Sequence, residues 1–460
     1  MGLAQGSLAT DTRVRLRLLL ASALTGLLAG VVVSGYRWLL EHIEVWVAAM
    51  YGFVGANLAW LPALVLALAA LGFALGALGR RFPMTSGSGI PQVVAVIKGY
   101  LKDFWLTTLV AKFIGGAAAM LGGLALGREG PCIQMGACVG GGVGRQLAAN
   151  RQERRLLVAG GASAGLSAAF GAPLAGVIFV FEEVFHLLSP LTMLTTAVAA
   201  IAADYTLRLL LGAEPVFQLN ASGSLPLNSY WVLVVLGIAL GLIGAAYNIC
   251  LVRLQRGYGH LWKGERSSFT VVLADSAGGR IAGWFKYRLP HLLAGVKAAK
   301  PVPILLLAIP VGLCFPVALS SGKTAFDALA PTATAGFLAL LLLVRFAFSV
   351  VSFAAGAPGG ILFPLLILGA ITGALAGLFA LNVLGVDPGL FDGFIIVAMA
   401  GAFAAIVRAP ITGIVLLLEM TGNFTHLLPL TLVSITAYLT AEFLRVPPVY
   451  ASLLKSLLED

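Results

Sequence analysis

The sequence predicts an all-α, polytopic membrane protein whose two halves share a duplicated pattern of broken helices. Of the 460 residues, 60% are hydrophobic and only 10% are charged, whereas soluble domains average about 25% charged residues. The mean hydropathy is +0.99. Apolar runs of about 20 residues, the length that spans a bilayer, recur along the chain. Three short motifs also occur twice in the same order.

Apolar segments make up most of the chain, and short polar connectors separate them. We expect membrane-embedded segments at 18–40, 58–78, 105–126, 156–183, 191–211, 230–252, 302–319, 337–353, 360–381, 395–407, 411–420 and 427–444. Several of these segments are too short, or too often interrupted by Gly and Pro, to cross a bilayer alone. Interrupted helices in matching positions of two halves are typical of transporters.

The duplication involves three motifs. Gly26, Gly30 and Tyr36 recur as Gly237, Gly241 and Tyr247, at an offset of 211 (237 − 26). The pattern Gly-x3-Pro-x4-Gly-Ala-x2-Gly at 127–140 recurs at 360–373, at an offset of 233 (360 − 127). The pattern Ala-Pro-x2-Gly followed by Glu at 172–182 recurs at 409–419, at an offset of 237 (409 − 172). Because the motifs keep their order, they indicate an internal duplication. The first apolar segment belongs to it, so we do not expect a cleaved signal peptide there.

The repeat sets the expected domain boundaries. We expect a cytoplasmic segment at 1–17, a first membrane repeat at 18–212, a connector at 213–229, a second membrane repeat at 230–450 and a tail at 451–460. The second repeat contains a polar connector at about 253–300.

The net charge of +10 does not indicate nucleic-acid binding, because the basic residues stand in short connectors. This distribution fits cytoplasmic loops that follow the positive-inside rule; the residues are Arg13, Arg15, Arg17, Arg80, Arg81, Arg145, Arg151, Arg154 and Arg155. The four cysteines are scattered and form no CxxC pair. We therefore expect no zinc site, no other metal site and no cofactor.

The segment Gly127-Arg128-Glu129-Gly130-Pro131 puts a carboxylate in the middle of an apolar, glycine-rich run. Gly-x-x-Gly-Pro before an apolar segment predicts the start of a helix, with Pro131 in its first turn. The free N–H groups of such an end attract an anion, which can be Glu129 itself or an ion that competes with it. A purely structural glutamate at a helix start is the alternative. Intramembrane carboxylates, however, usually have a function.

Two further features are candidates for function. Glycine-rich residues 85–91 form a turn before an apolar helix, with the hydroxyl of Ser88 at its centre. Glu182 and Glu183 end another apolar segment. Glu182 has a repeat counterpart in Glu419 and is interpreted as structural, whereas Glu183 is matched by Met420. A feature that occurs in only one half is not required by the shared scaffold, so Glu183 is the better functional candidate.

Together these segments resemble the CLC family of chloride channels and chloride/proton antiporters, in its short, prokaryotic-type form without cytoplasmic regulatory domains. The segments are 87–91 (GSGIP), 127–131 (GREGP), 356–364 (GAPGGILFP) and 448–450 (PVY). The resemblance implies a CLC-type fold of two inverted-topology repeats. It also implies a homodimer in a prokaryotic inner membrane, with an anion path in each subunit.

The resemblance also implies roles for individual residues. Ser88 and Tyr450 would donate hydroxyl hydrogen bonds to the anion, and the backbone N–H groups of Ile361 and Leu362 would line the same site. Glu129 would be the gating glutamate and Glu183 the inner proton-transfer glutamate. The helix-start positions would be Gly87, Gly89, Pro91, Gly127, Arg128, Gly130, Pro131, Gly360 and Pro364. The chain departs from the family at Leu362, where Phe is usual, and in its long polar connector.

We therefore expect a non-enzymatic exchanger of chloride, or a similar small anion, for protons. A passive CLC-type channel gated by Glu129 is the alternative, against which Glu183 argues. An intramembrane hydrolase using paired carboxylates lacks a nucleophile–base pair, and a sodium-coupled transporter would share the repeat but not the motifs. Residues 321–324 (SGKT) resemble part of a P-loop, but Val317 replaces its first glycine, so this similarity is interpreted as noise.

Overall fold

The computed structural model describes residues 12–102, 104–185, 189–212, 217, 225–262 and 298–459, and every structural statement below refers to these residues. They form helices and one isolated β-bridge, with no strand among them. Eight helices are long and apolar enough to cross a membrane. The all-α fold class is thus confirmed.

The helices follow one another in two series. The first series is α2 (Thr12–Ala56), α3 (Leu61–Arg81), α4 (Ile90–Lys98), α5 (Trp105–Leu121), α6 (Glu129–Leu147), α7 (Arg151–Phe170), α8 (Pro173–Phe179) and α9 (Pro190–Leu211). The second series is α10 (Tyr230–Trp262), α13 (Val302–Cys314), α14 (Lys323–Asp327), α15 (Ala335–Ala354), α16 (Leu362–Leu384), α17 (Phe391–Val407), α18 (Pro410–Thr421), α19 (Leu427–Phe443) and α20 (Val449–Glu459).

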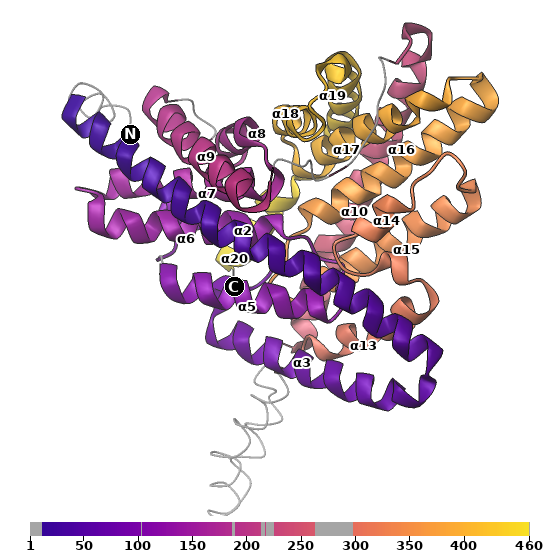
Figure 1. Ribbon diagram of the computed structural model, residues 1–460, viewed down its shortest axis with the longest axis horizontal. Helices are drawn as coiled ribbons and strands as arrows, with labels where there is room; N and C mark the ends of the chain where they lie inside the picture. The colour runs from indigo at the N-terminus through magenta and orange to yellow at the C-terminus, as the bar shows by residue number, and fades with distance from the viewer. Residues whose placement is uncertain are drawn as a thin grey trace, which may run out of the picture.

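The two series pack in the same way, as the duplication predicts. Helix α6 packs on α7 and α16 packs on α17, the first pair on the left of Figure 1 and the second on the right. A side chain at Gly136 would collide with the carbonyl of Gly161, and one at Gly369 would collide with that of Ala398. Small residues are therefore required at equivalent crossings, because the backbones approach closely there.

The first duplicated motif is also a packing seam. Gly26 packs against Ala199 of α9, and Gly237 packs against Val433 and Thr436 of α19. Its two tyrosines, Tyr36 and Tyr247, are fully buried. This motif therefore holds α2 on α9 and α10 on α19, and it serves the scaffold in both halves.

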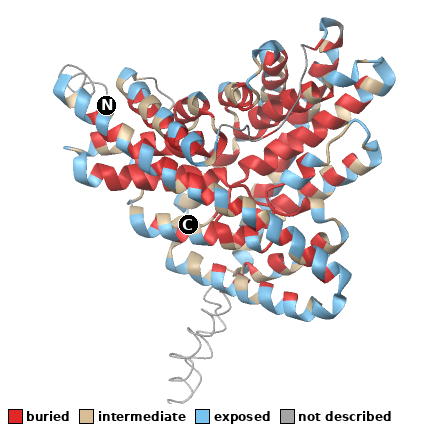
Figure 2. Ribbon diagram, in the orientation of Figure 1, coloured by how far each residue is buried: buried red, intermediate tan, exposed pale blue. Residues whose placement is uncertain are grey.

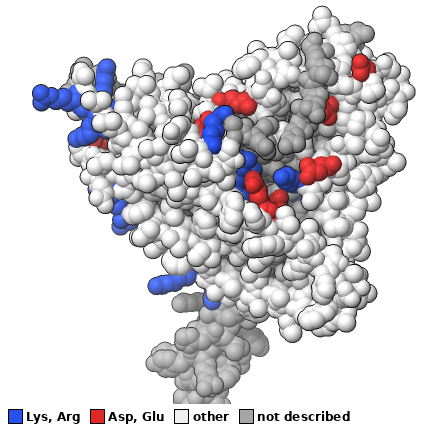
Figure 3. Space-filling view, viewed as in Figure 1, with Lys and Arg blue, Asp and Glu red and all other residues white. Residues whose placement is uncertain are grey.

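Burial is greatest in the central helices. Figure 2 shows red ribbon through the middle of the molecule, whereas the outer helices are largely pale blue on one side. Many exposed side chains of the outer helices are apolar, such as Leu20 and Val31 of α2, Phe73 of α3 and Leu209 of α9. Most of the surface drawn in Figure 3 is uncharged; basic side chains gather at its upper left, and acidic and basic side chains lie together near its centre. The apolar outer faces of these helices suit contact with lipid rather than with water.

Some element boundaries differ from those expected. Helix α2 has 45 residues and begins at Thr12, inside the segment expected at 1–17. Helix α10 continues to Trp262, so the connector expected at 253–300 begins as helix, and its residues 263–297 lie outside the described part. Helix α8 ends at Phe179, and a π-helical turn, Val180–Phe185, follows it. Turns of this kind are frequent at functional sites.

The repeat-matched glutamates hold the two halves together. Glu182 accepts hydrogen bonds from the backbone N–H groups of Ile411 (3.2 Å) and Thr412 (2.7 Å) at the start of α18. In the other half, Glu419 accepts from the N–H groups of Leu174 (2.9 Å) and Ala175 (2.8 Å) at the start of α8. Each acid thus caps a helix of the opposite half, where free N–H groups and the helix dipole favour a negative charge. The structural interpretation of this pair is confirmed.

Removing one of these caps is expected to destabilise the fold. Glu182→Ala leaves two N–H groups and the Thr412 hydroxyl without their acceptor, and loss of a cap costs about 0.5–2 kcal/mol. The melting temperature of the purified protein in detergent should fall. Glu182→Gln is the matched control, because its amide oxygen still accepts hydrogen bonds and the loss should be smaller. An Ala variant as stable as the wild type would contradict the capping role.

Candidate functional site

The two copies of the central motif meet at the middle of the molecule. Gly127 and Gly360, which are repeat counterparts, form an antiparallel bridge with two backbone hydrogen bonds of 2.7 Å. Because Gly127 lies two residues before α6 and Gly360 two residues before α16, the bridge brings the starts of both helices together. The free N–H groups of two helix ends therefore converge on one region, which attracts anions.

The carboxylate of Glu129 lies in this region. Glu129 is fully buried, and its Oε2 accepts a hydrogen bond of 3.1 Å from the backbone N–H of Phe363. The N–H groups of Arg128 and Glu129 itself also face the carboxylate. Its Oε1 has no hydrogen-bond partner among the described residues. An acidic side chain of one half thus occupies a backbone donor at the helix start of the other half.

Ile361 and Leu362, the donors expected from the sequence, are at the same helix start. Both are buried, Ile361 as the N-cap and Leu362 as the first residue of α16. The first N–H to bond back within the helix is that of Leu365, which donates to the carbonyl of Ile361 (3.0 Å). The N–H groups before it are the free donors of a helix end. Phe363, which contacts Glu129, was missed, because the motif did not specify which donor Glu129 would use.

Ser88 and Tyr450 come together although 362 positions (450 − 88) separate them. Ser88 stands just before α4 and Tyr450 in the first turn of α20, and these helices pack on each other. Each residue is only 2% exposed. Neither hydroxyl has a hydrogen-bond partner in the described part of the chain, although the two side chains lie close enough to interact. Two buried hydroxyls with unused bonding capacity need an explanation, and a ligand supplies one.

Gly130 connects this hydroxyl pair with the Glu129 region. A side chain at Gly130 would lie 2.5 Å from both the carbonyl oxygen and the hydroxyl of Ser88. The start of α6 can therefore approach Ser88 only if residue 130 is glycine. Tyr450 also lies within electrostatic range of Glu129 and Glu183. Of the four side chains that the sequence singled out, the structure thus places Ser88 beside Tyr450, and it puts Tyr450 within electrostatic range of Glu129 and Glu183.

Glu183 differs from Glu182 in its surroundings. Glu182 accepts hydrogen bonds at the start of α18, whereas Glu183 is half-buried and lies within electrostatic range of Tyr450, Lys98 and Glu182. Its repeat counterpart, Met420, is buried. The two neighbouring acids therefore lie in different surroundings, because successive residues of a helical turn point in different directions.

A buried cation supports each half, and its contacts were not foreseen. Lys112 is fully buried, and its Nζ donates to the carbonyls of Thr85 (2.9 Å) and Gly87 (2.6 Å). These carbonyls belong to the loop that presents Ser88. Lys112 therefore fixes that loop and adds positive charge beside it without occupying the position of a ligand.

Arg345 is the counterpart of Lys112, at the same offset of 233 (345 − 112). It donates to the carbonyls of Ala318 (2.6 Å), Leu319 (3.1 Å), Ser320 (2.9 Å) and Ser321. Ser321-Gly322 matches Ser88-Gly89 at this offset. The resemblance of residues 321–324 to a P-loop was noise, as interpreted, but the segment is the second copy of the Ser88 turn. The common offset could have revealed this.

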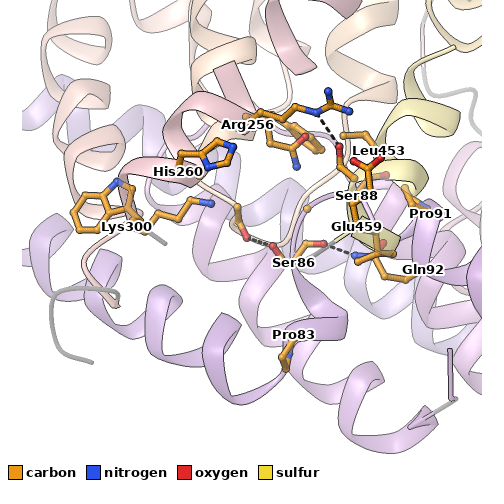
Figure 4. Close-up of a pocket in the computed structure, with 18 residues that line it drawn as sticks. Pro83, Ser86, Ser88, Pro91, Gln92, Arg256, His260, Lys300, Leu453 and Glu459 are labelled. Atoms are coloured by element: carbon orange, nitrogen blue, oxygen red, sulfur yellow. Dashed lines mark hydrogen bonds between the residues drawn. The ribbon is translucent and has the colours of Figure 1, made fainter. Parts of the chain in front are cut away.

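A cavity of about 600 Å³ leads to Ser88 from the surface (Figure 4). We call it the Ser88 cavity; Ser86, Ser88, Gln92, Arg256, Lys300 and Ser456 are among the residues that line it. Hydrogen bonds fix its wall: Ser86 donates to the carbonyl of Gly356 (2.9 Å) and Gln92 to that of Ser86 (2.8 Å). Arg256 donates to the Ser456 hydroxyl (3.2 Å), which joins α10 to α20. The cavity therefore brings water and small solutes up to the wall that contains Ser88, whose hydroxyl itself is buried.

Comparisons with known proteins agree with this arrangement. Residues 71–442 match the family model described as voltage gated chloride channel. The chain is 33% identical over 456 residues to an H(+)/Cl(-) exchange transporter ClcA of Salmonella arizonae, covering 95% of this chain and 88% of that protein. It is also 33% identical over 459 residues to an H(+)/Cl(-) exchange transporter ClcA of Vibrio cholerae, covering 96% and 90%.

Solved structures share the fold. A slow cyanobacterial Cl-/H+ antiporter matches with a TM-score of 0.82 and 28% identity, covering 96% of this chain and 98% of that one. A CLC-type fluoride/proton antiporter matches with a TM-score of 0.71 and 22% identity, covering 96% and 99%. With the family model matching most of its length, and with a duplicated fold whose halves meet at Gly127 and Gly360, the chain belongs to the CLC, or voltage-gated chloride channel, family.

Proposed function

We propose that this protein exchanges chloride, or a similar small anion, for protons across a membrane. The observation that carries the proposal is the position of Glu129, whose carboxylate accepts from the backbone N–H of Phe363 at the helix start of the opposite half. A group that can be protonated thereby uses a donor that a transported anion also needs. The names of the relatives, which are exchange transporters and antiporters, support the same reaction.

Protonation of Glu129 and anion binding are then linked. An anion at the helix starts competes with the Glu129 carboxylate for backbone donors, and the displaced carboxylate is more easily protonated because it has lost them. By reciprocity, protonation of Glu129 frees these donors for the anion. Exchange of the two ions needs a linkage of this kind.

The polar groups around the path attract an anion only moderately. Hydroxyls, as in Ser88 and Tyr450, and backbone N–H groups, as in Ile361 and Leu362, bind chloride without neutralising it. The buried Lys112 is engaged with the carbonyls of Thr85 and Gly87. Conduction requires that an ion be able to leave as well as enter, so moderate donors suit transport better than a fixed cation at the site.

A separate proton route through Glu183 favours an exchanger over a passive channel. Glu183 is half-buried and within electrostatic range of Tyr450, which in turn lies within range of Glu129. We assign Glu183 as the inner proton acceptor, which exchanges protons with water on its side and passes them toward Glu129. A channel would need Glu129 as a gate but no second acid.

The orientation follows from the basic residues. Arg80 and Arg81 end α3, two residues before Pro83, which lines the Ser88 cavity. By the positive-inside rule this cavity faces the cytoplasm. We further propose that the protein resides in a prokaryotic inner membrane as a homodimer; cross-linking in native membranes tests the dimer.

Chloride-driven proton movement in proteoliposomes tests the function. Vesicles loaded with a high chloride concentration are diluted into a medium low in chloride, with no initial pH gradient. Because chloride that leaves is exchanged for protons that enter, the vesicle interior should acidify. Empty vesicles are the control, and chloride loss without acidification would leave only the channel alternative.

The paired hydroxyls of Ser88 and Tyr450 should contribute to anion affinity. One neutral hydrogen bond is worth about 0.5–1.5 kcal/mol, which corresponds to about a 2- to 12-fold change in affinity. Ser88→Ala and Tyr450→Phe should each weaken chloride binding in calorimetry by such a factor, and the double variant should weaken it further. A double variant that unfolds like the wild type and binds chloride equally well would count against this site.

A further inference from the structure

Beyond Glu129 lies a second group of charges, of which only Arg128 belongs to a motif and none has a role in the proposed function. We call it the Arg128 cluster; it consists of Arg37, Glu41, Glu44, Arg128 and Lys323. Arg37 and Arg128 both donate to Oε1 of Glu41, at 3.1 Å and 3.3 Å. Lys323 also lies within electrostatic range of Glu41. One carboxylate thus lies among three cations.

The cluster reaches the surface apart from the Ser88 cavity. The Glu41 side chain is 38% exposed, and Lys323 is exposed as well. None of the five residues is among those that line the Ser88 cavity. The cluster and the cavity therefore reach the surface at separate places.

Arg128 connects the cluster with the gating glutamate. It directly precedes Glu129, and its guanidinium lies 5.7 Å from the ring centroid of Phe363, whose N–H holds the Glu129 carboxylate. The Arg128 side chain is only 9% exposed. Its Nε is buried and has no hydrogen-bond partner among the described residues. Arg128 thus retains unused bonding capacity for an anion beside Glu129.

We propose that Glu41 is a tethered anion that holds Arg128, and that a small monovalent anion entering from this side displaces the Glu41 carboxylate. This inference rests on the proposed anion transport. In this role Glu41 lowers the affinity of the entrance for the transported ion. Without it, Arg37, Arg128 and Lys323 would present three cations to an incoming anion, which would then leave slowly. Glu41 acts through Arg128 and is therefore a positioning residue.

Glu44 provides a matched comparison on the same helix. It lies one turn beyond Glu41 on α2, and it accepts a hydrogen bond of 3.3 Å from the backbone N–H of Ser321. It also lies within electrostatic range of the buried Arg345. Glu44→Gln removes the same charge from the same region, but it leaves the contact between Glu41 and Arg128 intact. The pair of variants therefore separates the specific contact from a general effect of charge.

The test measures initial chloride uptake into proteoliposomes at several external chloride concentrations, with ionic strength held constant by an impermeant anion. Reconstitution inserts the protein in both orientations, so uptake has two saturable components. In Glu41→Gln the half-saturating chloride concentration of one component should fall about fivefold, the size expected for removing one partly exposed charge pair. The other component should not shift. Glu44→Gln should change the half-saturating chloride concentration of either component less than twofold. Added impermeant salt should reduce the shift seen in Glu41→Gln, because it screens the charges of the cluster.

Two results would overturn the proposal. One is an unchanged half-saturating concentration in Glu41→Gln, and the other is an equal shift in Glu44→Gln, which would indicate diffuse surface charge. If Glu41→Gln does not fold, Glu41→Ala replaces it in the test. This variant leaves no amide to bond Arg128, and it should lower the half-saturating chloride concentration of one component in the same way. A failure of the proposed exchange can be told apart from a failure of this proposal. Wild-type vesicles would then move chloride without protons, whereas the shift in the half-saturating chloride concentration of Glu41→Gln could still be measured.

Discussion

Replacing Glu129 by Gln is expected to abolish proton transport while chloride flux continues. Gln has the shape of the protonated side chain but cannot bind and release a proton. It also carries no negative charge to compete for the N–H of Phe363, which the carboxylate now occupies at 3.1 Å. The anion path should therefore stay open, and coupling should be lost.

Parallel recordings of chloride loss and internal pH from proteoliposomes measure this effect. Wild-type vesicles should acidify as chloride leaves, whereas Glu129→Gln vesicles should lose chloride with no change of internal pH beyond that of empty vesicles. Proton uptake at the wild-type ratio to chloride in this variant would remove Glu129 from the proton route. A variant that transports neither ion would contradict its role as a gate that opens when neutral.

Replacing Glu183 by Gln is expected to have the second large effect, on protons alone. Glu183 is not among the groups that act on the Glu129 carboxylate, and it lies within electrostatic range of Tyr450 and Lys98. Its replacement should therefore leave the anion path intact and interrupt the separate route of the proton. Chloride flux should stay within about threefold of the wild type, while coupled proton uptake disappears; loss of a positioned proton-transfer group typically costs about 10²–10⁴-fold in rate.

The neighbouring Glu182 is the control for this experiment. Glu182→Gln changes an adjacent acid by the same chemistry, but this residue caps α18 through Ile411 and Thr412. Coupling should survive in Glu182→Gln. If protons still move against their gradient in Glu183→Gln, the internal acceptor lies elsewhere and the case against a passive channel loses its main support.

Much of the scaffold could be predicted because the sequence contains it twice. The offset that pairs Gly127 with Gly360 indicated two matching helix starts, and the structure joins these glycines by two hydrogen bonds. The offset that pairs Glu182 with Glu419 indicated a shared structural role, and each acid caps a helix of the other half. Repetition is informative because a position needed for packing is needed in both copies.

Other features could not be read from the sequence, because they depend on contacts between distant segments. The offset links Lys112 to Arg345, but it does not reveal that their partners are backbone carbonyls. Any residue type can supply a carbonyl, so no side-chain pattern marks such a partner. The contact between Glu129 and Phe363 is of the same kind. Helix lengths were also uncertain, since apolar composition does not mark where α2 or α10 leaves the membrane.

The central claim is that Glu129 and the transported anion compete for the same donors. Calorimetric titration of the purified protein with chloride, in buffers of different ionisation enthalpy, measures this competition as the number of protons taken up per chloride bound. Because chloride displaces the carboxylate from Phe363, we predict net proton uptake by the wild type and none by Glu129→Gln. Chloride binding to the wild type with no proton uptake at any pH would contradict the account.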